Sequence, residues 1–236
     1  LIPEGPILEI GCGTGILSSF LPEIFPDRQI IFSDLSADMV TICRDKMSAA
    51  RAEKNALSQA SAKKKKTTES SGTFEWRVLD AEELKTHSDY AAIVSSFAIQ
   101  WFFQPFKGIS RLLSALRPEG ALIFTVPGDD SCPQWKAAAN KLEIPFTRNP
   151  LPAYDELMDF AGKMGLEFDI KQRIAEETYS DAAAMLHSLQ VLGASTQKSD
   201  MRLSYLQLRK LMRELDSCHD EVNLTYQVIS AFLRRV

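Results

Sequence analysis

The fold of this chain is decided by the segment Leu8-Glu9-Ile10-Gly11-Cys12-Gly13-Thr14-Gly15, in which a short apolar strand runs directly into a glycine-rich turn. Glycine suits such a turn because the main chain must bend sharply and let a ligand approach closely. A glycine-rich turn that opens a helix after a buried strand is typical of Rossmann-like α/β folds. The segment therefore predicts a ligand site at the carboxyl edge of a parallel sheet.

Around this segment, short apolar runs alternate with longer amphipathic stretches, which is the pattern of a parallel sheet flanked by helices. The strands that this pattern predicts span 7–10, 29–33, 74–79, 90–95 and 121–126. The predicted helices lie near 17–25, 37–58 and 106–116. We expect the carboxyl ends of these strands to meet at one edge of the sheet.

The composition changes after Val126, because prolines punctuate short helical segments from Pro127 onward. We expect a helical insertion over 127–165 that forms a substrate-side cap. The pattern beyond it predicts a strand near 168–177, helices near 181–192 and 201–216, and a closing strand over 222–232. The last two strands are expected to pair as an antiparallel edge. The expected fold is a single Rossmann-like α/β domain over 1–236, with a seven-stranded, mostly parallel sheet.

An acidic residue, Asp34, ends the second predicted strand nineteen residues after Gly15. Its carboxylate can accept two hydrogen bonds at once, as the two hydroxyls of a ribose require. Dinucleotide enzymes place a GxGxxG turn beneath a pyrophosphate, whereas a GxGxG turn preceded by Glu9 favours S-adenosylmethionine. A dinucleotide site and a purely structural turn are the alternatives.

Two further strand ends extend the predicted cofactor site. Asp80 and Ala81 follow the third strand, where a carboxylate and a main-chain amide can bind adenine; a helix N-cap is the alternative role of Asp80. Ser95 and Ser96 end the fourth strand. The residues predicted to contact the cofactor are Glu9, Gly11, Cys12, Gly13, Gly15, Asp34, Leu35, Asp80, Ala81, Ser95 and Ser96.

The segment that continues from Ser95 to Trp101 is predicted to line the reaction centre. Gln100 has an amide that can form hydrogen bonds, and Trp101 has a large flat aromatic ring. Both are therefore predicted to position a substrate. A place in the apolar core is the alternative for Trp101.

The composition excludes several classes of protein. The 236 residues, 45% of them hydrophobic, suffice for one domain with additions, and a net charge of -4 argues against a general binder of nucleic acid or anionic membrane. The four cysteines and three histidines are scattered without ligand spacing, so neither a disulfide framework nor a metal site is expected. With neither a long apolar run nor a signal peptide, the chain is expected to be a soluble, cytoplasmic monomer.

Positive charge is concentrated between Arg44 and Lys66. This stretch contains eight lysines and arginines but only two acidic residues. A solvated helix end followed by a linker is one interpretation. A docking surface for an acidic partner is the other.

Several motifs together resemble the malonyl-acyl carrier protein O-methyltransferases of biotin biosynthesis, the BioC family. They are the glycine segment, the SxxAIQW pattern over 95–101, Leu116-Arg117-Pro118-Glu119-Gly120, the 185–194 segment and Leu224-Thr225-Tyr226-Gln227-Val228. Ser96 and Gln190 depart from the family, which commonly has Asn and a basic residue there. The family's amino-terminal helix is expected to be missing from this chain, which begins at Leu1.

The resemblance implies transfer of a methyl group from S-adenosylmethionine to the free carboxylate of malonyl on an acyl carrier protein. A carboxylate is already ionised at pH 7, so no acid or base catalyst is expected, and alignment supplies the acceleration. Arg148 is a candidate to hold that carboxylate, with a surface salt bridge as its alternative role. Rival functions are methylation of a free small acid such as an aconitate, and a non-catalytic cofactor-binding scaffold.

The carrier protein is predicted to dock on the basic run at Arg44–Lys66, because acyl carrier proteins are acidic. The competing prediction places docking on Arg111, Arg117 and Arg148, near the carboxyl ends of the strands.

Overall fold

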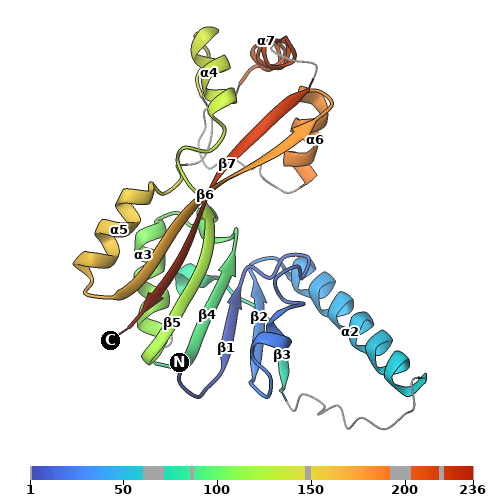
Figure 1. Cartoon of the computed structure of the whole chain (residues 1–236), viewed down its shortest axis with the longest axis vertical. Helices are drawn as coiled ribbons and strands as arrows, with labels where there is room; N and C mark the ends of the chain where they lie inside the picture. Colours follow the sequence, from blue (N-terminus) through green and yellow to red (C-terminus); the bar gives the residue numbers. More distant parts are fainter. Residues whose placement is uncertain are drawn as a thin grey trace. The chain divides into compact units, whose positions relative to one another are not determined.

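The computed structural model describes residues 2–60, 72–85, 88–146, 150–191, 203–217 and 221–235 (Figure 1). Only the main chain is described at 54–60 and at Val191. Two of the predicted functional features, Lys63–Lys66 and Arg148, lie outside these ranges.

Within the described residues, seven strands form one sheet in the order β3-β2-β1-β4-β5-β7-β6 (Figure 1). Their bounds are β1 Ile7–Ile10, β2 Ile30–Asp34, β3 Phe74–Val78, β4 Tyr90–Ser96, β5 Leu116–Pro127, β6 Glu167–Tyr179 and β7 Val222–Arg234. The strands β1 to β5 pair in parallel. The predicted Rossmann-like, mostly parallel sheet is confirmed, and the chain reverses its direction of winding between β1 and β4.

β7 lies between β5 and β6 and runs antiparallel to both. The Arg235 amide donates to the Gly120 carbonyl and the Gly128 amide to the Gln227 carbonyl, so residue numbers rise on β5 as they fall on β7. On the other side, Thr178 pairs with Asn223 and Arg234 with Glu167. The predicted antiparallel pair is present, and β6 is its edge strand.

Within the described residues, seven helices connect these strands, and two short 3-10 turns follow β3 and β4. Their bounds are α1 Leu21–Ile24, α2 Ala37–Ala60, α3 Pro105–Ala115, α4 Pro133–Lys141, α5 Tyr154–Lys163, α6 Ala182–Val191, α7 Tyr205–Asp216, η1 Ala81–Glu83 and η2 Ile99–Trp101. None of the described helices is long and apolar enough to cross a bilayer.

Some predicted boundaries were wrong, including the start of the helix predicted near 201, which is at Tyr205. The helix expected over 17–25 is confined to α1, because Pro22 lacks an amide hydrogen and fits only the first turn of a helix. β5 begins at Leu116 rather than at 121, because Leu116 already pairs with Tyr90 before a register shift brings Ala121 opposite Ala92.

The chain divides into two compact units. The first comprises Leu1–Val126, Met158–Ile170 and Ser230–Val236, and the second comprises Pro127–Leu157 and Lys171–Ile229. Each unit has its own apolar core, the first around Ile7, Ile30 and Phe32 and the second around Met185, Leu211 and Leu224. The second unit is larger than the 127–165 insertion predicted from the sequence, because it also contains α6, α7 and most of β6 and β7.

Candidate functional site

The glycine turn that follows β1 has the backbone geometry that requires glycine. Gly11, Gly13 and Gly15 all have positive φ, at 69°, 50° and 81°. The Cys12 amide donates to the Ser33 carbonyl of β2, at 2.8 Å, and so fixes the turn against the neighbouring strand. Residues other than glycine are strained in this conformation. The three glycines therefore determine the shape of the turn.

The three glycines differ in what surrounds them. A Cβ added at Gly11 would lie 2.3 Å from the Cβ of Ala98, and one at Gly15 would lie 3.3 Å from the Sγ of Cys43. A Cβ at Gly13 would meet no heavy atom within 4 Å. Gly11 therefore lets the turn pack against the segment after β4, whereas Gly13 leaves its main chain open for a ligand to approach.

Glu9 lies beneath this turn and is almost completely buried, with 1% of its surface exposed. Burial raises the pKa of its carboxyl from 4.5 to about 8, although the hydroxyl of Ser18 donates to Oε2 at 2.6 Å and opposes that rise. Burial therefore favours the protonated form of the Glu9 carboxyl at neutral pH. The main-chain carbonyl of Glu9 also accepts from Ser33 Oγ at 2.6 Å, which ties β1 to β2.

Asp34, at the end of β2, holds the turn through both oxygens of its carboxylate. Oδ2 accepts from the Gly13 amide and Oδ1 from the Ser36 amide, each at 2.9 Å. A carboxylate offers about four acceptor positions, so further hydrogen bonds to a ligand can form there. The structure thus brings the predicted ribose acceptor into direct contact with the open glycine.

Apolar side chains are exposed at or after the carboxyl ends of β2, β3 and β4. Leu35 is 70% exposed, Val78 59%, Phe97 41% and Phe103 82%. Since parallel strands end at one edge of the sheet, these residues flank the edge where the glycine turn lies. Exposed apolar side chains at such an edge are suited to covering a flat heterocycle.

Asp80 and Ala81 follow β3, as predicted, and Asp80 is also an N-cap. Its side chain accepts from the Glu82 amide at 2.9 Å, which is the alternative role considered for it. Ala81 is buried. Sequence reasoning missed Glu82, whose carboxylate accepts from the amides of Phe103 and Gln104 and so ties η1 to the residues that follow η2.

The two serines at the end of β4 have different environments. Ser95 is buried and its hydroxyl donates to the Ile10 carbonyl of β1. Ser96 is exposed, with its hydroxyl 3.2 Å from that of Thr125 on β5. Ser95 therefore holds the strands together, and Ser96 is the one of the pair that a ligand can reach.

Gln100 supports a turn of strained backbone. Its Nε2 donates to the Phe97 carbonyl at 2.7 Å, and Phe97 has a φ of 53°, which is uncommon for an aromatic residue. Gln100 is 9% exposed, and Trp101 beside it is half-buried. The contact of Gln100 with Phe97 gives it a role in shaping this turn, and contact of either side chain with a substrate stays a prediction.

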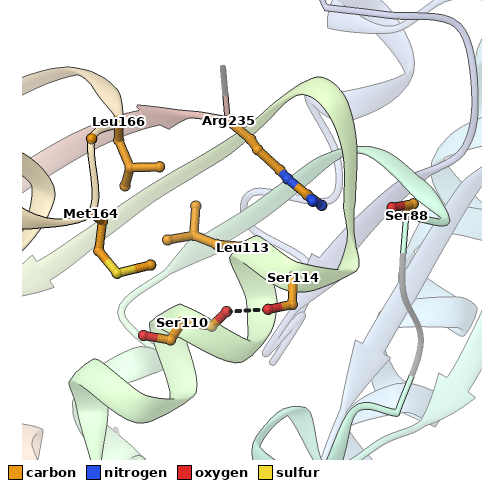
Figure 2. Close-up of a pocket in the computed structure, with 8 residues that line it drawn as sticks. Ser88, Ser110, Leu113, Ser114, Met164, Leu166 and Arg235 are labelled. Carbon is orange, nitrogen blue, oxygen red and sulfur yellow. Dashed lines mark hydrogen bonds between the residues drawn. The ribbon is translucent and has the colours of Figure 1, made fainter.

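A separate pocket of about 420 Å³ lies at the opposite edge of the sheet, where β4 and β5 begin (Figure 2). Its polar groups serve the fold: Ser110 and Ser114 donate to carbonyls of α3, and Arg235 donates to the Leu116 carbonyl. None of the residues predicted to bind cofactor lines it.

Arg117 lies at this opposite edge too, at the start of β5. It donates to the main-chain carbonyls of Asp89 and Glu4. The prediction that placed Arg117 near the carboxyl ends of the strands was therefore wrong.

Among the described residues, no group of three or more His, Cys, Asp or Glu side chains is arranged to hold a metal.

The comparisons with known proteins agree with this geometry. A model of the methyltransferase domain family matches residues 8–122. The YcgJ protein of Bacillus subtilis, at 14% identity, has the same fold, with a TM-score of 0.61 over 98% of this chain and 92% of its own. The glycine turn, the carboxylate at the end of β2 and the sheet order are those of a Rossmann-like, S-adenosylmethionine-dependent methyltransferase.

The similarity to curated relatives extends through both units. The malonyl-[acyl-carrier protein] O-methyltransferase of Halalkalibacterium halodurans is 30% identical over 94% of this chain and 79% of its own length. The enzyme of that name from Magnetococcus marinus is 27% identical over 99% of this chain and 80% of its own length. The chain belongs to the family of malonyl-[acyl-carrier protein] O-methyltransferases.

Proposed function

We propose that this chain transfers a methyl group from S-adenosylmethionine to the free carboxylate of a malonyl group that is carried by an acyl carrier protein, giving the methyl ester. The observation that carries the proposal is the open main chain at Gly13 beside Asp34, in a chain related to these enzymes over both units. Biotin biosynthesis is the process that the family serves.

The residues present fit the cofactor. Gly11, Gly13 and Gly15 would form its cradle, Asp34 would accept hydrogen bonds from its ribose, and Leu35 would cover its base. Glu9, Cys12 and Ser95 are buried beneath the site, so their role in this assignment is to hold the cradle in shape. Asp80, Ala81 and Ser96 complete the proposed contacts, with the Asp80 carboxylate shared between the Glu82 amide and the ligand.

The proposed methyl transfer does not require a general acid or a general base. S-adenosylmethionine supplies an electrophilic methyl group when bound. A malonyl carboxylate is ionised at neutral pH, so the residues of this chain need only orient its oxygen and exclude water. The turn over 97–101 is proposed to do this, because Gln100 fixes its backbone and places Phe97 and Trp101 beside the end of β4.

A free small acid, such as an aconitate, is the rival substrate. The carrier-bound substrate is favoured because both of the curated relatives compared above carry the name of the carrier-protein enzyme, and their similarity includes the second unit. The non-catalytic alternative is disfavoured by the intact glycine turn and Asp34.

The test is mass spectrometry of malonyl-carrier protein incubated with S-adenosylmethionine and the complete protein. The expected product is heavier by one methylene unit. Free malonate and aconitate, at equal concentrations, are the controls. Methylation of a free acid at a higher kcat/KM than the carrier-bound substrate would reject the proposal.

A further inference from the structure

The exposed face of α7 carries both apolar and basic side chains. Leu206 and Tyr205 are each 70% exposed, and Arg209, Lys210 and Arg213 are exposed on the same helix. The spacing of Leu206, Arg209, Lys210 and Arg213 is i, i+3, i+4 and i+7, which places them on one side of an α-helix. We name these four residues, together with Tyr205, the α7 face.

The opposite side of α7 anchors the helix in the second unit. Leu211 and Leu215 are buried there, and α7 packs against α4 and α6 (Figure 1). A capping box between Ser204 and Gln207 fixes its start. The α7 face therefore belongs to a helix that is anchored on its other side, and it points away from the core of the second unit.

The carboxylates near the α7 face are already engaged elsewhere. Glu214 pairs with Lys141 of α4 at 2.6 Å, and Asp216 accepts from the Ala182 amide at 2.7 Å. Arg209 lies over the ring of Tyr205, 5.6 Å from its centre. Within the described part of the chain, no carboxylate pairs with Arg209, Lys210 or Arg213.

We propose that the α7 face is the docking surface for the acidic carrier protein. The inference rests on the proposed function, since that function requires a substrate delivered on such a partner. Three clustered cations on a chain of net charge -4 complement a partner rich in carboxylates, and they steer its approach. Leu206 and Tyr205 supply the apolar contact that a specific protein interface needs at its centre.

An anionic membrane is the other surface that attracts an amphipathic basic helix. Helices that lie in a membrane surface bury a broad apolar face. The apolar side of α7 is buried in the core of the second unit. Its exposed side has two large apolar residues among three cations. The combination suits a small acidic protein better, and vesicle binding decides between the two.

The test uses the complete protein with three variants. The first is the triple variant Arg209→Ser, Lys210→Ser, Arg213→Ser; the second is Leu206→Ser. The matched variant removes three charges from the rival basic run, as Lys63→Ser, Lys64→Ser, Lys65→Ser. Thermal unfolding checks that each variant folds; Leu206 is largely exposed, so its variant keeps the test available if the triple change fails to fold.

The triple α7 variant should raise the KM for malonyl-carrier protein about tenfold at low ionic strength, and Leu206→Ser about threefold, with kcat unchanged. The KM for S-adenosylmethionine and for malonyl-N-acetylcysteamine, which lacks the carrier, should not change. Raising the salt to about 0.5 M should shrink the effect of the triple variant to less than about twofold, because salt screens exposed charges. The matched lysine variant should behave like the parent.

Three results would overturn the α7 assignment while leaving the proposed function intact. One is an unchanged KM for the carrier substrate in the triple variant. Another is a larger effect from the lysine variant than from the α7 variants. The third is binding of the parent to phosphatidylglycerol vesicles that the triple variant loses with no change in KM for the carrier. By contrast, a parent that leaves malonyl-carrier protein unmethylated would reject the proposed function itself.

Discussion

Glu9 in the first unit and Gln227 in the second are both almost fully buried, at 1% and 4% exposure, yet their surroundings differ. Glu9 accepts from Ser18, and burial raises the pKa of its carboxyl to about 8. Gln227 donates to Gln172 and Asp130 and accepts from the Asp130 amide. The first unit thus keeps a polar group beneath its glycine turn at a cost in stability, whereas the second uses one to join β6, β7 and the turn before α4.

The largest effect that tests this comparison is the pH dependence of stability due to Glu9. Its carboxyl has a pKa of about 8 when folded and about 4.5 when unfolded, so the folded chain binds the proton more tightly. The stability that this proton provides is fully present below pH 4.5 and is lost as the pH rises to 8. The loss amounts to at most about 5 kcal/mol.

Glu9→Gln should remove that dependence, because an amide stays neutral throughout. Urea unfolding of parent and variant at pH 5 and pH 8 measures it, with the variant gaining relative to the parent at the higher pH. A difference between the two proteins that is the same at both values would show that folded Glu9 is ionised.

Gly11→Ala should cost about 2–5 kcal/mol of unfolding free energy, because the new Cβ lies 2.3 Å from Ala98 and φ is 69°. Gly13→Ala is the matched control, since φ is 50° and nothing lies within 4 Å. It should cost only about 1–2 kcal/mol of stability and yet weaken cofactor binding at least about tenfold. Denaturant titration and calorimetry separate the two; equal effects on stability would contradict the difference drawn between these glycines.

Asp34→Ala should weaken binding of S-adenosylmethionine by about 2–4 kcal/mol, because the ribose loses its acceptor and the Gly13 amide loses its partner. Isothermal calorimetry is the measurement, and Asp34→Asn serves as the control that keeps the size and one acceptor oxygen. Unchanged affinity in the alanine variant would remove Asp34 from the cofactor site.

In the second unit, Gln227→Glu should destabilise the chain by about 1–3 kcal/mol at pH 7. A carboxylate cannot donate to Asp130 or to Gln172, and it would place a negative charge beside Asp130. The change therefore tests whether the partners of Gln227 require an amide at this position. Stability equal to that of the parent, measured by thermal unfolding, would contradict the network described here.

The glycine turn and the first five strands could be predicted because their signals are local. Each buried strand is a continuous apolar run, and positive φ at Gly11, Gly13 and Gly15 depends on residues within the turn itself. The mostly parallel Rossmann-like sheet and the cofactor class followed from those signals, and both are confirmed. Which residues contact the cofactor and the substrate stays a prediction.

Partners far apart in the sequence could not be predicted. Nothing near Gln227 indicates that it binds Gln172, 55 residues away, or that Glu82 binds amides that lie 21 and 22 residues later. The extent of the second unit depends on such contacts, because β6 and β7 contribute residues to both units. The α7 face was missed for another reason. The sequence of this helix is that of an ordinary amphipathic segment, and only the structure shows which side is buried.

The pairing of Gly13 with Asp34 also bears on inhibition of the enzyme by its own product. On the proposed assignment, the glycine turn and Asp34 hold the adenosine portion of the cofactor, which is identical before and after the methyl group leaves. Interactions that do not distinguish reactant from product bind both equally well. S-adenosylhomocysteine should therefore compete with S-adenosylmethionine for the same site, and the steady rate should depend on how quickly the product is removed from solution.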